Sequence, residues 1–122
     1  MESSLALTII GSTMGLVGMI FIFIPKLVNN KIMGQIPVEA VDISALFRII
    51  LGGSATAIGF IAIYCRNIPS LYANDLLFSL GVGFIVINSQ IISAKFRGFG
   101  KELPIPPIVL FFILATIAFI SS

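Results

Sequence analysis

The side chains best placed to do chemistry in this sequence are Arg48, Asn88 and Gln90, because each stands inside a long apolar run. Polar side chains within a membrane are costly to insert and usually mark a functional site. At a helical rise of about 1.5 Å per residue, Arg48 lies about 9 Å from the middle of its run, and the two amides lie at a similar depth in theirs. We therefore expect Arg48 and one of these amides to form a polar pocket suited to an anionic headgroup or a polar cofactor head.

Two simpler interpretations of the same residues stay open. An arginine near the end of a membrane span often snorkels to the headgroups and fixes the topology of the chain. Intramembrane amides such as Asn88 and Gln90 often serve only to hydrogen-bond neighbouring helices together.

Residue types that the sequence lacks exclude several other kinds of site. It contains no histidine, and no Asp or Glu lies inside an apolar run, so a proton relay, a haem or metal site and a carboxylate-driven exchanger lack their necessary groups. The single cysteine, Cys65, cannot form an internal disulfide or a redox pair. Lys and Arg are scattered without a basic face, which argues against nucleic acid. We predict no enzymatic activity, no metal and no cofactor.

The elements that must position Arg48 and the amides are membrane-spanning helices. Hydrophobic residues make up 58% of the 122 positions and charged residues 10%, whereas soluble domains are about 25% charged. Backbone polar groups in lipid must be satisfied within each span, which favours helices. The sequence therefore predicts one all-α domain over residues 1–122, a bundle of four transmembrane helices. The predicted spans are residues 5–24, 46–64, 76–94 and 105–120.

The loops between these spans differ in charge, and the difference predicts an orientation. The first and third loops together carry most of the basic residues, namely Lys26, Lys31, Lys95, Arg97 and Lys101. The side that holds the second loop and both termini has only Arg66. Because short cytoplasmic loops retain Lys and Arg, loops 25–43 and 95–104 should be cytoplasmic and both termini should lie on the outer side.

The first and second loops also predict local structure. Apolar and polar residues alternate after Pro25, which favours a short helix lying on the inner membrane surface. Pro37 is suited to open a new helix before the second span. In the second loop, Asn74 or Asp75 is expected to cap the third span.

Small residues recur at helical spacing in the first two spans and allow close approach of helix backbones. This pattern predicts helix packing inside one bundle or, as an alternative, homodimerisation through Gly11-xxx-Gly15. Another membrane protein is a further expected partner, beside membrane lipids. The small residues are Gly11, Gly15 and Gly18 in the first span, with Gly52, Gly53, Ala55, Gly59 and Ala62 in the second.

The pattern of Arg48, Gly52-Gly53 and Gly59 resembles a bacterial family of small four-helix membrane proteins that is known as a domain of unknown function, and it is distantly similar to the DoxX-like proteins. The resemblance covers most of the chain. It implies a four-helix bundle in a bacterial plasma membrane and no established activity. The chain departs from the family at Ser89-Gln90, where third spans of such proteins often end in a Gly-Arg pair.

These observations lead to three functional hypotheses. The first is an accessory or scaffold subunit without a catalytic site, which contacts lipid headgroups through the Arg48 region. The second is a small transporter or permease component, with Asn88 and Gln90 lining a polar path. The third is a DoxX-like component of a quinone-linked redox system, in which the Arg48 pocket holds a quinone head.

Overall fold

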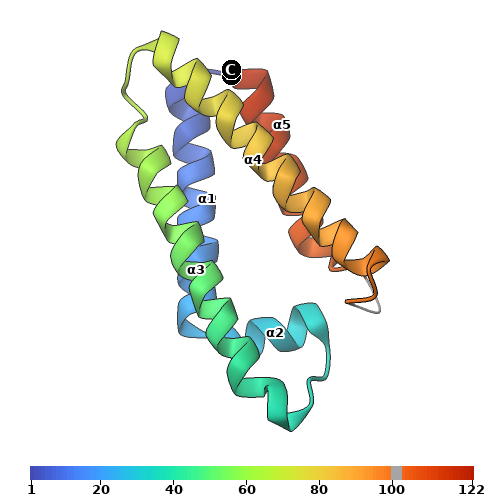
Figure 1. Cartoon of the computed structure of the whole chain (residues 1–122). Coiled ribbons are helices and arrows are strands. Elements are labelled where there is room, and N and C mark those ends of the chain that lie inside the picture. Colours follow the sequence, from blue (N-terminus) through green and yellow to red (C-terminus); the bar gives the residue numbers. More distant parts are fainter. Residues whose placement is uncertain (100–102) are drawn as a thin grey trace. The chain divides into compact units, whose positions relative to one another are not determined.

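The fold of the protein is built from helices, as its computed structural model shows for residues 1–99 and 103–122 (Figure 1). No strand occurs in these two ranges, so the all-α prediction is confirmed for them. Lys101, which contributes to the predicted basic loop, lies outside the described residues. The helices are α1 (Ser3–Phe23), α2 (Pro25–Met33), the 3-10 turn η1 (Val38–Ala40), α3 (Val41–Tyr64), α4 (Ser70–Phe96) and α5 (Ile105–Ser121).

In the part of the chain that the structure describes, three helical segments are long and apolar enough to cross a membrane. They are α1 with 21 residues, the segment Val38–Tyr64 with 27, and α4 with 27. At about 1.5 Å per residue, even the shortest of them extends about 32 Å, the thickness of the hydrocarbon core. These lengths and compositions indicate an integral membrane protein. The fourth apolar helix, α5, is shorter, with 17 residues.

The start of α4 differs from the predicted span, and the predicted cap is wrong. The helix begins at Ser70, directly after Pro69, and no side chain caps it. Asn74 and Asp75 therefore lie inside the helix. The reason is that a polar residue can bound an apolar run without ending the helix. The 27 residues of α4 rise about 40 Å, whereas the hydrocarbon core is about 30 Å thick. Polar turns of the helix can therefore lie outside the hydrocarbon.

The first loop contains the two helical starts that its sequence predicts. The helix α2 begins with Pro25 in its first turn, where a missing N–H is harmless. It ends at Gly34, whose φ of 74° is a backbone conformation that glycine adopts at no steric cost. Pro37 then precedes η1, which leads directly into α3. Thus α3 begins before residue 46, the predicted start of the second span.

The chain forms two units, each with its own helix contacts. In the α1–α3 unit (Thr8–Tyr64), α1 runs beside α3 and α2 packs on α3 (Figure 1). In the α4–α5 unit (Met1–Leu7 and Cys65–Ser122), α4 packs along α5 (Figure 1). The buried face of α4 repeats every three or four residues, as expected for one side of a helix. Its members are Ala73, Leu77, Gly81, Phe84 and Asn88.

Candidate functional site

Arg48 lies near the start of α3 and is half-buried. Its Nε donates a hydrogen bond of 2.7 Å to Oδ1 of Asn29 in α2. Its guanidinium carbon lies 4.9 Å from the ring centroid of Phe21 in α1, a cation–π distance, and Nη2 is 3.8 Å from Sδ of Met33. Arg48 is therefore held by α1 and α2 together.

Asn29 is the most informative partner of Arg48, because it is polar and only 1% exposed. A guanidinium has no acceptor, so the amide oxygen of Asn29 must face Arg48 and its NH₂ group must face the other way. That nitrogen, Nδ2, is buried and has no hydrogen-bond partner among the described residues. A buried donor without a partner costs about 1–3 kcal/mol, so Nδ2 is a candidate ligand contact.

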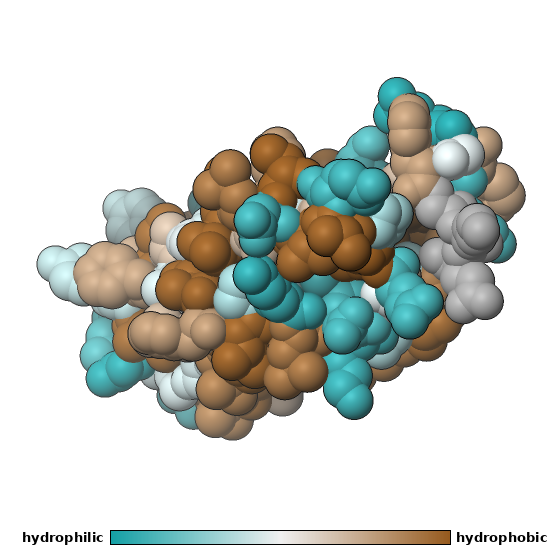
Figure 2. Space-filling model, turned by 90° about the horizontal axis from the view of Figure 1, so that it is seen from below, coloured by the Kyte–Doolittle hydropathy of each residue, from teal (hydrophilic) through white to brown (hydrophobic). Residues whose placement is uncertain are grey.

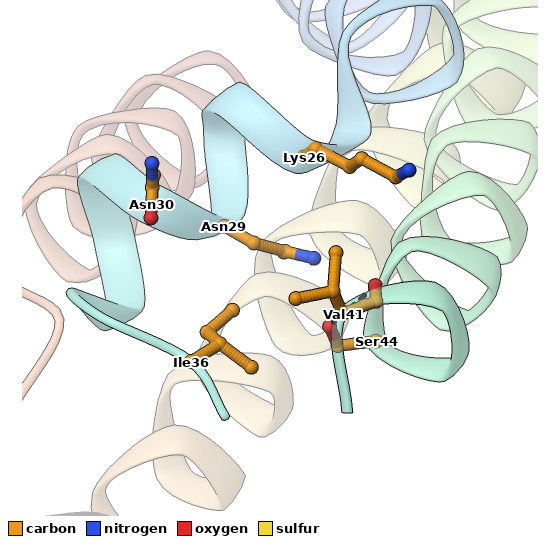
Figure 3. Close-up of a pocket in the computed structure, with 6 residues that line it drawn as sticks. All are labelled: Lys26, Asn29, Asn30, Ile36, Val41 and Ser44. Atoms are coloured by element: carbon orange, nitrogen blue, oxygen red, sulfur yellow. Dashed lines mark hydrogen bonds between the residues drawn. The ribbon is translucent and has the colours of Figure 1, made fainter. Parts of the chain in front are cut away.

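A cavity of about 130 Å³ lies beside Asn29, between α2 and the start of α3. Figure 3 shows the Asn29 side chain extending from α2 toward Val41 and Ser44 of α3. The hydroxyl of Ser44 donates to the carbonyl of Ala40 at 2.7 Å, which leaves its oxygen able to accept. The cavity therefore offers both donors and an acceptor. Its lining residues are Lys26, Asn29, Asn30, Ile36, Val41 and Ser44.

The charged groups of this region have an excess of positive charge. Nζ of Lys26 lies 3.3 Å from Oδ1 of Asp42, and both side chains are largely exposed, at 64% and 93%. Exposed pairs of this kind contribute at most about 1 kcal/mol. Lys26 can therefore exchange its partner at little cost. Over residues 25–48, the three cations Lys26, Lys31 and Arg48 outnumber the two carboxylates Glu39 and Asp42.

The outer surface of α2 combines apolar and basic side chains. Leu27 and Met33 are 51% and 56% exposed, and Lys26 and Lys31 are exposed beside them. Figure 2 shows hydrophilic residues set among strongly apolar ones on the face seen from below. A helix with this composition suits the boundary between headgroups and acyl chains.

The predicted small residues bring the backbones of α1 and α3 together. A Cβ atom at Gly59 would lie 2.7 Å from the carbonyl oxygen of Gly11 and 2.7 Å from the nitrogen of Gly15. A Cβ at Gly52 would lie 2.7 Å from the carbonyl oxygen of Gly18. Real Cβ atoms do not approach so closely, so this contact requires glycine.

Not every small residue of the prediction lies in that contact. Ala55 is buried on the same face of α3 as Gly52 and Gly59. A Cβ at Gly53, however, would meet nothing within 4 Å. The backbone of Gly15 lies in the contact with Gly59, but a Cβ added at Gly15 would also meet nothing within 4 Å. This close approach of α1 and α3 is packing inside one chain, and homodimerisation through Gly11-xxx-Gly15 stays a prediction.

Asn88 and Gln90 do not share one face of α4. Asn88 is buried, and its Nδ2 donates to the carbonyl of Ile108 in α5 at 3.0 Å, whereas Gln90 is exposed. Residues two apart on a helix point to different sides. Asn88 thus connects α4 to α5. A pocket of Arg48 with either amide would join residues of two units, and it stays a prediction.

The sequence-based interpretation missed Asn29 as the partner of Arg48. A signal was present in the sequence. Asn29 lies shortly after the end of the first predicted span and Arg48 shortly after the start of the second, so both lie near the same side of the membrane. An amphipathic helix in that loop must bury one of its faces. Asn29 and Val28 are the buried residues of α2.

Comparisons with known proteins give no assignment for this site. No protein-family model, no curated protein and no solved structure matches the chain. The resemblance to the bacterial four-helix family therefore stays a hypothesis. Within residues 1–99 and 103–122, no three His, Cys, Asp or Glu side chains lie together in a way that holds a metal ion.

Proposed function

We propose that the protein is a non-enzymatic four-helix membrane protein, an accessory or scaffold subunit that contacts anionic lipid headgroups through the Arg48 region. The observation that carries the proposal is the hydrogen bond between Arg48 and Asn29. This bond holds the amphipathic helix α2 against the start of α3, directly after α1 ends. Arg48 is thereby held next to Asn29, which lines a cavity together with a second cation, Lys26.

The proposed topology includes α5 as the fourth span. Its 17 residues extend about 26 Å, at the short end of the range for transmembrane helices. With four spans, loops 25–43 and 95–104 share one side, and their Lys and Arg residues favour the cytoplasm. The anionic inner leaflet of a bacterial plasma membrane would then face α2 and attract its basic residues, at about 1 kcal/mol for each.

The α4 amides support a scaffold more than a transporter. Asn88 uses its NH₂ group on the Ile108 carbonyl, as interhelical amides in membrane bundles commonly do. Gln90 is on another side of α4 and exposed, so the two side chains do not line one polar path along this helix.

The proposal is tested by Arg48→Gln in protein extracted with its native lipids. Gln keeps a donor for Asn29 but removes the charge. We expect the ratio of anionic to neutral lipids that co-purify, measured by mass spectrometry, to fall about fivefold, which corresponds to the loss of about 1 kcal/mol. Arg66→Gln is the matched control, because it removes the same charge from the loop between α3 and α4. An unchanged ratio in Arg48→Gln would refute the headgroup function.

A further inference from the structure

We propose that the cavity between α2 and α3 binds a phosphate-type oxyanion, which accepts a hydrogen bond from Nδ2 of Asn29 and is held by the ammonium group of Lys26. The inference rests on the proposed function, because it names the ligand class of the same region. The inference places the ligand on the side of Asn29 that faces away from Arg48, where Nδ2 of Asn29 contacts the ligand directly.

The first argument concerns the direction of the Asn29 amide. Arg48 occupies its oxygen at 2.7 Å, so the orientation of the amide is fixed and Nδ2 remains as a buried donor at the cavity. A donor requires an acceptor, which excludes a cation or a donor-only ligand at this point. The bond from a guanidinium also polarises the amide and strengthens its N–H groups as donors. The ligand therefore presents oxygen atoms to Asn29.

The second argument concerns charge. Lys26 lines the same cavity as Asn29. Its ion-pair partner Asp42 is largely exposed, so the pair is weak. An oxyanion can replace Asp42 as the partner of Lys26 without removing a buried interaction. Arg48 stands behind Asn29 as a second cation. Since three cations outnumber the two carboxylates Glu39 and Asp42 over residues 25–48, an anionic acceptor is favoured over a neutral one.

The third argument concerns size and shape. A water molecule occupies about 30 Å³ of liquid, whereas the cavity measures about 130 Å³. A tetrahedral oxyanion has several acceptor oxygens and can accept hydrogen bonds from Asn29 and Lys26 together. Ile36 and Val41 form an apolar part of the wall, which suits the carbon chain of a phosphate ester.

The test is a titration of detergent-solubilised full-length protein with two probes, inorganic phosphate and dihexanoyl phosphatidic acid, with chloride at the same ionic strength as the reference. The decisive variant is Asn29→Asp. Its carboxylate still accepts from Arg48 and so keeps α2 on α3, but it replaces the donor at the cavity with a negative charge. Asn67→Asp is the matched control, since it makes the same change at an exposed position in the loop after α3.

We expect saturable binding that Asn29→Asp weakens at least about tenfold, the equivalent of one hydrogen bond to a charged group, and that Asn67→Asp leaves unchanged. Binding of both probes identifies the phosphate group itself as the ligand. Binding of the lipid probe alone identifies a headgroup. The inference is overturned if the wild-type protein binds neither probe, or if Asn29→Asp binds as Asn67→Asp does. That failure is distinct from an unchanged lipid ratio in Arg48→Gln, which contradicts the proposed function instead.

Discussion

The two units of the protein pack their helices in different ways. Between α1 and α3, backbone meets backbone, as at Gly59 and Gly11. Between α4 and α5, aromatic rings fill the contact: Phe84 stacks on Phe111 with 5.8 Å between ring centroids, and the ring of Phe119 lies against Gly81. One contact thus depends on the absence of side chains and the other on their bulk.

This difference determines how each contact responds to an added atom. Lipid is as apolar as the helix surfaces, so association in a membrane depends on close packing and interhelical hydrogen bonds. A backbone atom in the way cannot move without moving its helix. A ring at the end of a side chain can rotate. The same substitution should therefore cost more between α1 and α3 than between α4 and α5.

The largest effect is expected for Gly59→Ala in α3. The new Cβ would lie 2.7 Å from the Gly11 carbonyl oxygen and 2.7 Å from the Gly15 nitrogen, and neither atom belongs to a movable side chain. Overpacking of this kind typically costs about 1–3 kcal/mol. The free energy of unfolding, measured by denaturant titration in micelles with circular dichroism, should fall by that amount.

Gly53→Ala is the matched control for Gly59→Ala, because it lies in the same helix and its Cβ would meet nothing within 4 Å. Alanine in a helix interior is favoured over glycine by about 0.5–1 kcal/mol, so this variant should be neutral or slightly more stable. Equal destabilisation by both variants would contradict the close contact of α1 and α3.

A smaller effect is expected for Asn88→Leu in α4. The substitution removes the hydrogen bond to the Ile108 carbonyl, and such bonds contribute about 0.6 kcal/mol on average in membrane bundles. It also removes Oδ1, which is buried and has no partner among the described residues, and this offsets part of the loss. The free energy of unfolding should fall by about 0.6 kcal/mol or less.

Ser89→Ala is the neighbouring comparison for Asn88→Leu. The Ser89 hydroxyl is exposed and donates to Ile85 within its own helix, so its removal should leave the contact between α4 and α5 intact. A loss of several kcal/mol in Asn88→Leu alone would show that Asn88 does more than connect two helices.

The smallest effect is expected for Gly81→Ala. Its Cβ would lie 2.8 Å from ring atoms of Phe119, but that side chain is 36% exposed and has room to rotate outward. The helix propensity of alanine compensates by about 0.5–1 kcal/mol, so the free energy of unfolding should change by less than about 0.5 kcal/mol. A loss as large as that of Gly59→Ala would remove the distinction between the two contacts.

Much of the fold could be predicted from the sequence, because membrane spans follow from the length of apolar runs. The ends of the helices could not. Asn74 and Asp75 stand directly before the third apolar run, yet α4 already begins at Ser70. Hydropathy marks where the hydrocarbon ends, whereas the helix ends where its backbone geometry changes, here at Pro69 and Gly34.

The sequence by itself determined the apolar helices, the small residues of α3 at spacings of three and four, and the presence of an arginine inside a span, because each is a property of one segment. Only the tertiary structure decided that Arg48 pairs with Asn29 and that Asn88 pairs with Ile108. Hydrogen bonds between residues about twenty positions apart depend on how the intervening chain turns back. Periodicity fixes which face of a helix a residue occupies, but the partner on that face depends on the packing of another helix.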